Sequence, residues 1–465
     1  MKKIIFFYCL LSAAVAQGQE SYWQQQVNFT INVSLHDQDN TLEAFETIEY
    51  INNSPDTLSF IWFHIWPNAY KNDRTAFSEQ LLKERRTDFY FSTAAQKGYI
   101  NQLDFKADGN NATIVTDSNN IDIVKVMLPK PLAPGSKTTI VTPFKVKLPF
   151  NFSRGGHVGK DYQITQWFPK PAVFDQKGWH AMPYLDQGEY YSEFGNFDVE
   201  ITAPSAYVIA ATGVLQDETT LQQLKEKGKH VIEGTTKVWH FKQNNIHDFA
   251  WFAGKDFEVH YDTVALPSKK VIDVFSYYKP KSTGWNESIS YAKNGLRKYS
   301  SWIGDYPYTT CSVVQGSKNE NSGGMEYPTI TLITTLQTGQ ELDATIVHEI
   351  GHNWFYGALA SNERIHPWMD EGMNTYYQKR YEKEKYGNIP VKNKGFSGKL
   401  PQSDEDMLLQ TIAKLKKDQP IETPAQDFTT INYGLVVYYK TSEWMKKLED
   451  ELGTAVFDNA MRSYY

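Results

Sequence analysis

The chain has 465 residues, of which 41% are hydrophobic, and it is therefore long enough to form two or more domains with their own cores. Its formal net charge is −7 at pH 7, which gives no indication of nucleic acid or an anionic membrane as a partner. Aromatic residues make up 14% of the chain, and the simplest explanation is that they fill large cores.

The first residues have the three parts of a secretory signal peptide. A basic start at Lys2 and Lys3 is followed by an apolar run and by an A-x-A cleavage site that ends at Ala16. The apolar run is too short to span a bilayer. We therefore predict a signal peptide over residues 1–16 and export to the periplasm or the extracellular space. Cleavage leaves one cysteine, Cys311, so no disulfide within the chain is expected.

An all-β domain is predicted for the next part of the chain. From Val27 to Leu35 apolar and polar residues alternate strictly, which is the pattern of a half-buried strand. Further strand-like runs, separated by turn residues, occur at 44–51, 58–64, 121–128, 138–148, 197–203, 207–212 and 238–243. Many short strands with few helical patterns predict a β saddle or sandwich, which we place at residues 20–256.

The pattern changes after residue 256. Helical patterns occur around 285–302, 341–356, 367–386 and 441–453, and strand-like stretches lie at 311–315 and 329–334. Polar segments at 392–399 and 401–406 predict a loop between helices. This mixture predicts a second domain of the α/β class over residues 257–465.

The segment V-H-E-I-G-H-N-W-F, residues 347–355, carries the strongest chemical signal in the chain. His348 and His352 are four residues apart, so on a helix they lie on one face, one turn apart. Two neutral imidazoles at this spacing can bind one Zn²⁺, and Glu349 can reach a water molecule on the metal. Because a catalytic zinc takes three protein ligands, a third ligand must lie elsewhere.

The third ligand is predicted downstream of this segment. A metzincin has a Gly three residues and a His six residues after the second histidine, but Phe355 and Ala358 occupy these positions. Glu371, in the sequence W-M-D-E-G-M, lies nineteen positions after His352, which leaves room for a loop and an antiparallel helix. The alternative is an accidental H-x-x-x-H on an ordinary helix, and the well-placed W-x-x-E-G argues against it.

With these motifs, the sequence resembles the aminopeptidase N family of zinc metallopeptidases, which are gluzincins with the signature H-E-x-x-H, eighteen residues, E. Upstream, Gly323 to Pro328 (G-G-M-E-Y-P) resembles the family's G-x-M-E-N, and downstream Val437 to Thr441 (V-Y-Y-K-T) resembles its Y-E-K-G. The resemblance implies one Zn²⁺ per chain and a thermolysin-like α/β catalytic domain after the β domain. In the family the catalytic domain normally continues past this length, so the alternatives are a minimal version or a truncated sequence.

The resemblance also implies roles for individual residues. Glu349 would deprotonate the attacking water, and Tyr438 would donate a hydrogen bond to the oxyanion that forms. Glu326 would pair with the α-ammonium group of the substrate, and Gly323 and Gly324 would let the substrate backbone approach closely. His348, His352 and Glu371 would hold the metal.

Four further positions compare with the family pattern. Tyr433 matches a second family tyrosine, and Gln166 matches the T-Q-x-E segment that reaches from the β domain into the active site. We therefore predict that Tyr433 and Gln166 bind substrate. Phe168 stands where the segment's acid is expected, and Tyr327 replaces an expected Asn. These two departures leave open whether cleavage is restricted to the amino terminus.

The leading hypothesis is an exported zinc-dependent aminopeptidase that hydrolyses peptide bonds at the amino terminus of peptides. The alternatives are a zinc endopeptidase of broader specificity and a non-catalytic binding or scaffold protein on the same fold. The intact Glu349 argues against a scaffold, which has no need of a general base. Peptides are the expected partners, with no nucleic acid and no transmembrane segment, and the sequence gives no indication of an oligomeric state.

Overall fold

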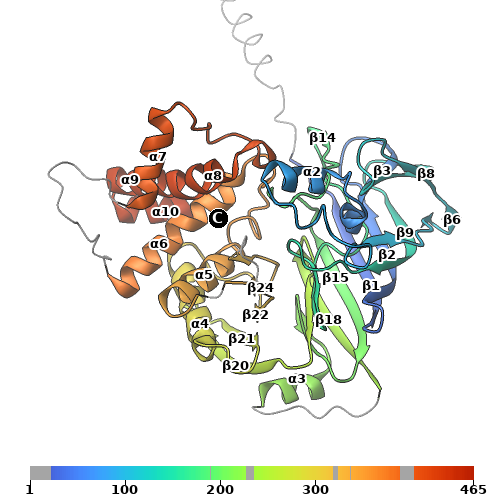
Figure 1. The fold of residues 1–465 in the computed structure, drawn as a ribbon, viewed down its shortest axis with the longest axis horizontal. Coiled ribbons are helices and arrows are strands. Elements are labelled where there is room, and N and C mark those ends of the chain that lie inside the picture. The colour runs from blue at the N-terminus through green and yellow to red at the C-terminus, as the bar shows by residue number, and fades with distance from the viewer. Residues whose placement is uncertain (1–21, 189, 227–234, 318–322, 336, 388–402) are drawn as a thin grey trace, which may run out of the picture.

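The computed structural model describes residues 22–188, 190–226, 235–317, 323–335, 337–387 and 403–465. Figure 1 shows two parts side by side, one built mainly from strands and the other from a small sheet and many helices. The predicted signal peptide and the polar segment 392–399 lie outside the described residues. Among the helices of the described ranges, none is both long enough and apolar enough to cross a membrane.

The largest sheet belongs to the N-terminal part and has nine strands. Eight of them follow the order β17-β18-β15-β1-β2-β9-β5-β6, and β4 also pairs with β9. Strand β1 is antiparallel to β2 and parallel to β15. The strands are β1 (Gln26–His36), β2 (Thr41–Ile51), β4 (Tyr99–Asn101), β5 (Lys106–Ala107), β6 (Asn110–Asn111), β9 (Lys137–Lys147), β15 (Gly195–Pro204), β17 (Val214–Leu215) and β18 (Thr236–Ile246).

Smaller sheets and short helices complete the N-terminal part. Two four-stranded sheets have the orders β12-β3-β8-β7 and β10-β11-β19-β16, and β13 pairs with β14. Their strands are β3 (Leu58–His64), β7 (Thr113–Thr116), β8 (Ile123–Leu132), β10 (Gly156–Val158), β11 (Asp161–Ile164), β12 (Lys170–Pro171), β13 (Phe174–Asp175), β14 (Gly178–Trp179), β16 (Val208–Ala211) and β19 (Trp251–Gly254). The helices are η1 (Trp66–Tyr70), α2 (Ala76–Lys83) and α3 (Glu218–Lys225).

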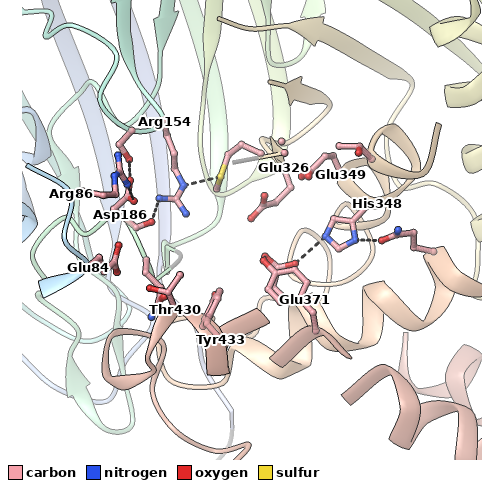
Figure 2. Close-up of a pocket in the computed structure, with 18 residues that line it drawn as sticks. Glu84, Arg86, Arg154, Asp186, Glu326, His348, Glu349, Glu371, Thr430 and Tyr433 are labelled. Carbon is pink, nitrogen blue, oxygen red and sulfur yellow. Dashed lines mark hydrogen bonds and ion pairs between the residues drawn. The ribbon is translucent and has the colours of Figure 1, made fainter. Parts of the chain in front are cut away.

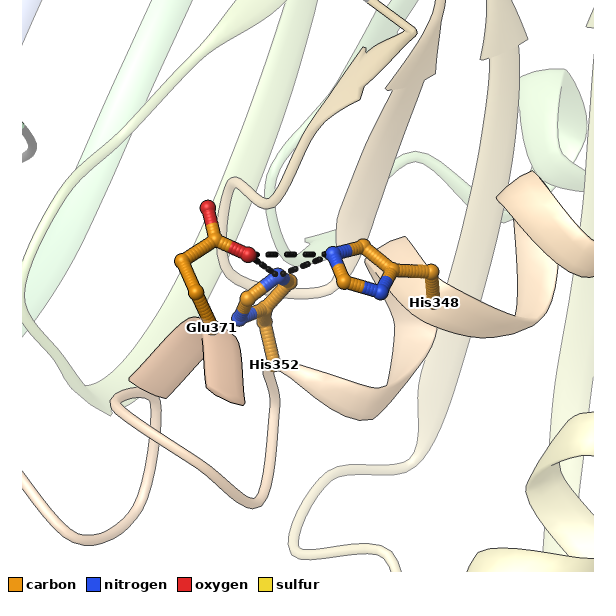
Figure 3. A group of neighbouring side chains, drawn as sticks. All are labelled: His348, His352 and Glu371. Atoms are coloured by element: carbon orange, nitrogen blue, oxygen red, sulfur yellow. Dashed lines mark hydrogen bonds and ion pairs between the residues drawn. The ribbon is translucent and has the colours of Figure 1, made fainter. Parts of the chain in front are cut away.

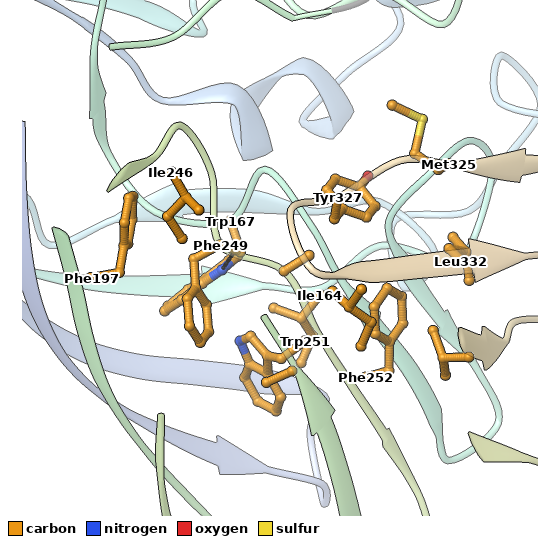
Figure 4. Packing of buried hydrophobic residues seen from close by; sticks show 14 of the residues in the cluster. Ile164, Trp167, Phe197, Ile246, Phe249, Trp251, Phe252, Met325, Tyr327 and Leu332 are labelled. Carbon is orange, nitrogen blue, oxygen red and sulfur yellow. Dashed lines mark hydrogen bonds between the residues drawn. The ribbon is translucent and has the colours of Figure 1, made fainter. Parts of the chain in front are cut away.

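Alternating side chains and aromatic rings hold these sheets together. The apolar residues of β1 from Val27 to Leu35 are all buried and face the core, as the sequence predicts. Figure 4 shows Trp167 and Trp251 in this core, where their rings meet edge to face. Phe168 is 2% exposed and contacts the ring of Phe29 at a centroid distance of 5.3 Å, so it packs in the core.

The C-terminal part has a five-stranded sheet in the order β20-β21-β22-β24-β23. Strands β21, β22 and β24 are parallel, and the edge strand β23 is antiparallel to β24. Helix α4 contacts β20, and helix α5 contacts β24. The strands are β20 (Glu258–Ala265), β21 (Val271–Tyr278), β22 (Thr310–Gln315), β23 (Gly324–Met325) and β24 (Ile330–Ile333).

Helices make up the remainder of this part. They are η2 (Trp285–Glu287), α4 (Ser288–Trp302), α5 (Gln340–Gly351), the π-helix η3 (Trp368–Gly372), α6 (Met373–Tyr386), α7 (Asp404–Lys414), η4 (Ala425–Asp427), α8 (Thr430–Asn432), the π-helix η5 (Tyr433–Lys440), α9 (Thr441–Leu452) and α10 (Thr454–Tyr464). Those that begin at Trp285, Gln340, Trp368 and Thr441 start close to the predicted positions, whereas α7, η4, α8, η5 and α10 were not predicted. The predicted fold class, a β domain followed by an α/β domain, is confirmed. The exact domain limits, 20–256 and 257–465, stay a prediction.

The loop predicted at 401–406 is wrong in its second half, because α7 begins at Asp404. The Ser403 side chain accepts a hydrogen bond from the backbone N–H of Asp406, which caps the helix. Acidic residues fill the first turn, where the positive end of the helix dipole stabilises them. A serine followed by acids is a helix start, and it outweighs the polar composition of the segment.

Candidate active site

Three side chains predicted as metal ligands converge at one point. His348 lies on α5 and His352 directly follows it, while Glu371 lies on the π-helix η3 that leads into α6. Figure 3 shows the three side chains pointing toward one another. The Nε2 atoms of His348 and His352 are 3.1 Å apart, and Glu371 Oε2 lies 3.0 Å from the first and 3.3 Å from the second.

This arrangement fits a tetrahedral metal ion. Ligand atoms about 2.0–2.2 Å from one Zn²⁺ lie roughly 3.3 Å from each other, close to the separations of the three side chains. The site is also buried and acidic. Burial alone would lower the pKa of His352, but the charges of Asp370, Glu326 and Glu371 raise it well above its usual value. A bound cation would compensate this excess of negative charge.

The carboxylate of Glu371 is stabilised in its ionised form. Burial by itself would raise the pKa of Glu371, but the charge of His352 and the hydrogen bond from His348 outweigh burial and lower it. The hydroxyl of Tyr438, from the π-helix η5, donates a hydrogen bond to Glu371 Oε1. The predicted tyrosine therefore lies at the metal ligands.

Three residues that the sequence analysis missed hold the histidines in place. The Nδ1 atom of His352 lies 2.5 Å from Asp370 Oδ1, and that of His348 lies 2.8 Å from Gln378 Oε1. The Asn374 side chain donates to the backbone carbonyl of His348 at 2.6 Å. The spacing in the sequence could have identified Asn374 and Gln378, because positions 371, 374 and 378 share one face of a helix. Such contacts orient metal ligands and fix their tautomers.

A cavity of about 760 Å³ opens beside the ligands, between the β domain and the helices. Figure 2 shows the side chains around it, with His348, Glu349 and Glu371 on one side and Arg86, Arg154 and Asp186 on the other. The lining residues are Glu84, Arg86, Ser153, Arg154, Asp186, Gln187, Gly323, Gly324, Met325, Glu326, Thr345, His348, Glu349, Glu371, Gln378, Thr430, Tyr433 and Tyr438.

Most of the predicted catalytic and substrate-binding residues line this cavity. Glu349 and Tyr438 reach it from α5 and η5, and Glu326 and Tyr433 also line it. Gly323 and Gly324 form its edge beside β23. A Cβ on Gly324 would lie 2.4 Å from Glu349 Oε1, so a glycine here leaves room for that carboxylate. The sequence motif G-G-M-E and the helix motif are thus in direct contact.

Gln166 is the exception among the predicted residues. It is 4% exposed and does not line the cavity. Its side chain donates to Asp248 Oδ2 at 2.5 Å and accepts from the ammonium group of Lys170 at 3.0 Å. The structure therefore places Gln166 in a buried polar network of the β domain and not beside the ligands. The family comparison alone suggested a role in substrate binding.

The β domain contributes a wall of the cavity that the sequence did not predict. Arg86 forms an ion pair with Asp186 and donates to the carbonyl of Phe152 at 2.8 Å. The Gln187 side chain donates to the carbonyls of Ala425 and Phe428, both at 2.9 Å. This wall is therefore joined to the C-terminal helices. Its residues come from separate loops, so no local pattern in the sequence connects them.

Comparisons with known proteins agree with this geometry. Residues 292–465 match the model of the Peptidase family M1 domain. Leucine aminopeptidase 2 of Candida glabrata is 24% identical over 351 residues, which are 71% of this chain and 50% of that protein. Leukotriene A-4 hydrolase of Xenopus laevis is 23% identical over 314 residues, which are 59% of this chain and 47% of that protein. The chain thus spans about half the length of these curated relatives.

Solved structures share the fold over almost the whole chain. An M1 zinc metallopeptidase from Deinococcus radiodurans superposes with a TM-score of 0.60 at 15% identity, covering 95% of this chain and 86% of that one. A mutant of that enzyme bound to a Tyr-Ser-Ala substrate gives the same TM-score of 0.60, also at 15% identity and with the same coverage of both chains. Residues 292–465 thus match the Peptidase family M1 domain, and the shared fold and the four ordered motifs agree with the resemblance of the chain to the aminopeptidase N family.

Proposed function

We propose that this protein is a zinc-dependent aminopeptidase that hydrolyses the first peptide bond of peptides. The observation that carries the proposal is the convergence of His348, His352 and Glu371 within 3.3 Å, on the wall of a cavity that also holds Glu349 and Glu326. One Zn²⁺ per chain, held by these three side chains, would supply Lewis-acid chemistry that polarises a carbonyl oxygen and makes water more acidic.

Glu349 is the proposed general base. It follows His348 on α5, and it lines the same cavity as His348 and Glu371. There it takes a proton from the attacking water and passes this proton to the amine that leaves. Its close packing against Gly324 fixes the position of the carboxylate before substrate arrives.

Glu326 and Tyr438 complete the proposed machinery. The Glu326 carboxylate is 8% exposed and lines the cavity next to Gly324, where it pairs with the α-ammonium of a peptide. This pairing determines which peptide bond lies at the ligands. The phenol of Tyr438 donates to Glu371 in this structure, and rotation of its O–H toward the substrate would redirect this hydrogen bond to the developing oxyanion. Tyr433 lines the same side of the cavity and contacts the ring of Tyr438 at a centroid distance of 5.8 Å.

Removal of one of the three proposed metal ligands is expected to lower the zinc content of the protein. His352→Ala leaves two protein ligands, so bound zinc falls well below one per chain in elemental analysis, and hydrolysis is lost. The matched control is His36→Ala, because His36 lies on the surface of the β domain and is far from the ligands in sequence. This control keeps full metal content. Full zinc occupancy in the His352→Ala variant would contradict the ligand assignment.

Replacement of the proposed general base is expected to leave zinc binding intact and to slow hydrolysis. Glu349→Gln keeps the shape of the side chain and all three metal ligands, so the variant binds one zinc per chain. Its kcat falls by about 10²–10⁴-fold, because the amide cannot accept the proton from water. Metal analysis and steady-state kinetics on an aminoacyl reporter substrate measure both quantities. Unchanged hydrolysis in this variant would argue for another base, and a wild-type protein without hydrolysis would favour a scaffold.

Amino-terminal specificity predicts a preference for a free α-amine. On paired peptides that differ only by acetylation, kcat/KM is about 10–100-fold higher for the free amine, because a charge-assisted hydrogen bond to Glu326 is worth about 1.5–3 kcal/mol. Glu326→Gln removes most of this difference while zinc content stays at one per chain. Equal cleavage of acetylated and free peptides by the wild-type protein would identify a zinc endopeptidase instead.

We also propose that the protein is exported, on the basis of the basic, apolar and A-x-A segments that end at Ala16. When the full chain is expressed in a bacterial host, the mature protein is expected outside the cytosol with Gln17 as its first residue. Amino-terminal sequencing of the fractionated protein tests this. A cytosolic protein that keeps the residues before Gln17 would contradict it.

A further inference from the structure

The two histidines of the proposed metal site have partners of different chemistry. The Nδ1 atom of His352 faces a carboxylate, Asp370, at 2.5 Å. A carboxylate that is ionised only accepts hydrogen bonds, so it requires a proton on Nδ1 and leaves the lone pair of Nε2 for the metal. The Nδ1 atom of His348 faces the amide of Gln378 at 2.8 Å. An amide can present either its oxygen or its N–H₂, so by itself it does not decide where the proton of His348 lies.

A second carboxylate resolves this ambiguity. Glu382 lies one turn after Gln378 on α6, and Gln378 Nε2 donates to Glu382 Oε1 at 2.9 Å. The other carboxylate oxygen of Glu382 accepts from the Gln340 side chain at 3.3 Å. Because Glu382 only accepts, the N–H₂ of Gln378 must face it, and the amide oxygen must face His348. A reversed amide would place two acceptors against each other and lose the hydrogen bond to Glu382.

We propose that Glu382, acting through Gln378, is a positioning residue that sets the tautomer of His348 and so prepares Nε2 to bind the metal. The inference rests on the proposed function, because it concerns the same three ligands. Without Glu382 the amide turns freely, and part of the metal-free protein holds His348 with its proton on Nε2, which cannot bind zinc. The chain of hydrogen bonds from Glu382 through Gln378 to His348, called the relay below, therefore raises metal affinity by pre-organising one imidazole.

Zinc affinity of the metal-free protein, measured by competition with a chromophoric chelator at one neutral pH, tests the proposal. Gln378→Leu removes the acceptor, and the zinc Kd rises about 10–100-fold. Glu382→Lys puts a donor where the acceptor stood, which turns the Gln378 amide around and raises the Kd by a similar factor. The matched control is Glu384→Lys, which makes the same charge change two residues along α6, at a surface ion pair with Lys298, and alters the Kd by less than about fivefold.

A swapped pair separates positioning from general damage. In the double variant Gln378→Glu/Glu382→Gln the new carboxylate accepts from His348 and the new amide donates to that carboxylate, so the order of donors and acceptors is restored. Its zinc Kd returns to within about fivefold of the wild type, and the visible spectrum of its Co²⁺ form matches that of the wild type. Thermal melting of the metal-free variants confirms that each is folded.

The outcomes are distinct for the two proposals. A wild-type protein that does not bind one zinc overturns the proposed function. A wild-type protein that binds zinc tightly, with Gln378→Leu or Glu382→Lys binding equally well, overturns only the relay. If Glu384→Lys weakens zinc as much as Glu382→Lys does, charge alone explains the loss and the relay is refuted.

Discussion

The close crossing of α5 and α6 is the constraint on which the site depends. Three ligand atoms from α5, the residue after it and η3 lie within 3.3 Å of one another, so the two segments pack closely at this point. Gly351 makes this possible, because a Cβ at this position would lie 2.0 Å from Asn374 Oδ1 and 2.5 Å from the ring of Tyr299. Asn374 then uses both ends of its amide, accepting from the Tyr299 hydroxyl at 2.8 Å and donating to the carbonyl of His348. Close packing and buried hydrogen bonds thus place the ligands before any metal arrives.

The same crossing is fixed at its other end by a buried charge. Asp343, in the first turn of α5, is completely buried and accepts hydrogen bonds from the Tyr381 hydroxyl at 2.9 Å and from the ammonium group of Lys385 at 2.6 Å. Both partners lie on α6. Asp343 is buried whereas the Lys385 side chain is partly exposed, and loss of these partners would leave the buried carboxylate uncompensated, so this contact resists sliding of one helix along the other. Helix α5 is therefore held to the η3–α6 segment by Asp343, by the Asn374 amide and by the His352–Asp370 hydrogen bond.

The sequence predicted those features that repeat at a fixed spacing. Alternation identified β1, and the four-residue step from His348 to His352 identified two candidate metal ligands, because backbone geometry alone places such side chains on one face. Gln378 shares the helical face of Glu371, and its role could have been predicted in the same way. Arg86, Asp186 and Gln187 could not, because loops far apart in the sequence bring them to the cavity. The π-helices η3 and η5 also escaped prediction, since a wider turn leaves no simple period in the sequence.

The position of Gln166 bears on how the proposed enzyme would recognise the amino terminus of a substrate. Its amide is bound to Asp248 and Lys170, which are themselves buried and form an ion pair of 3.0 Å, so this segment contributes to the interior of the β domain. Phe168, where the family has an acid, is equally committed to the core. Of the two carboxylate positions that bind the amine in the family pattern, the one held here by Glu326 lines the cavity. One charge-assisted hydrogen bond is worth about 1.5–3 kcal/mol, which gives a marked but finite preference for a free amine. The proposed aminopeptidase would therefore discriminate by degree, because Glu326 alone would bind the amine that two carboxylates share in the family pattern.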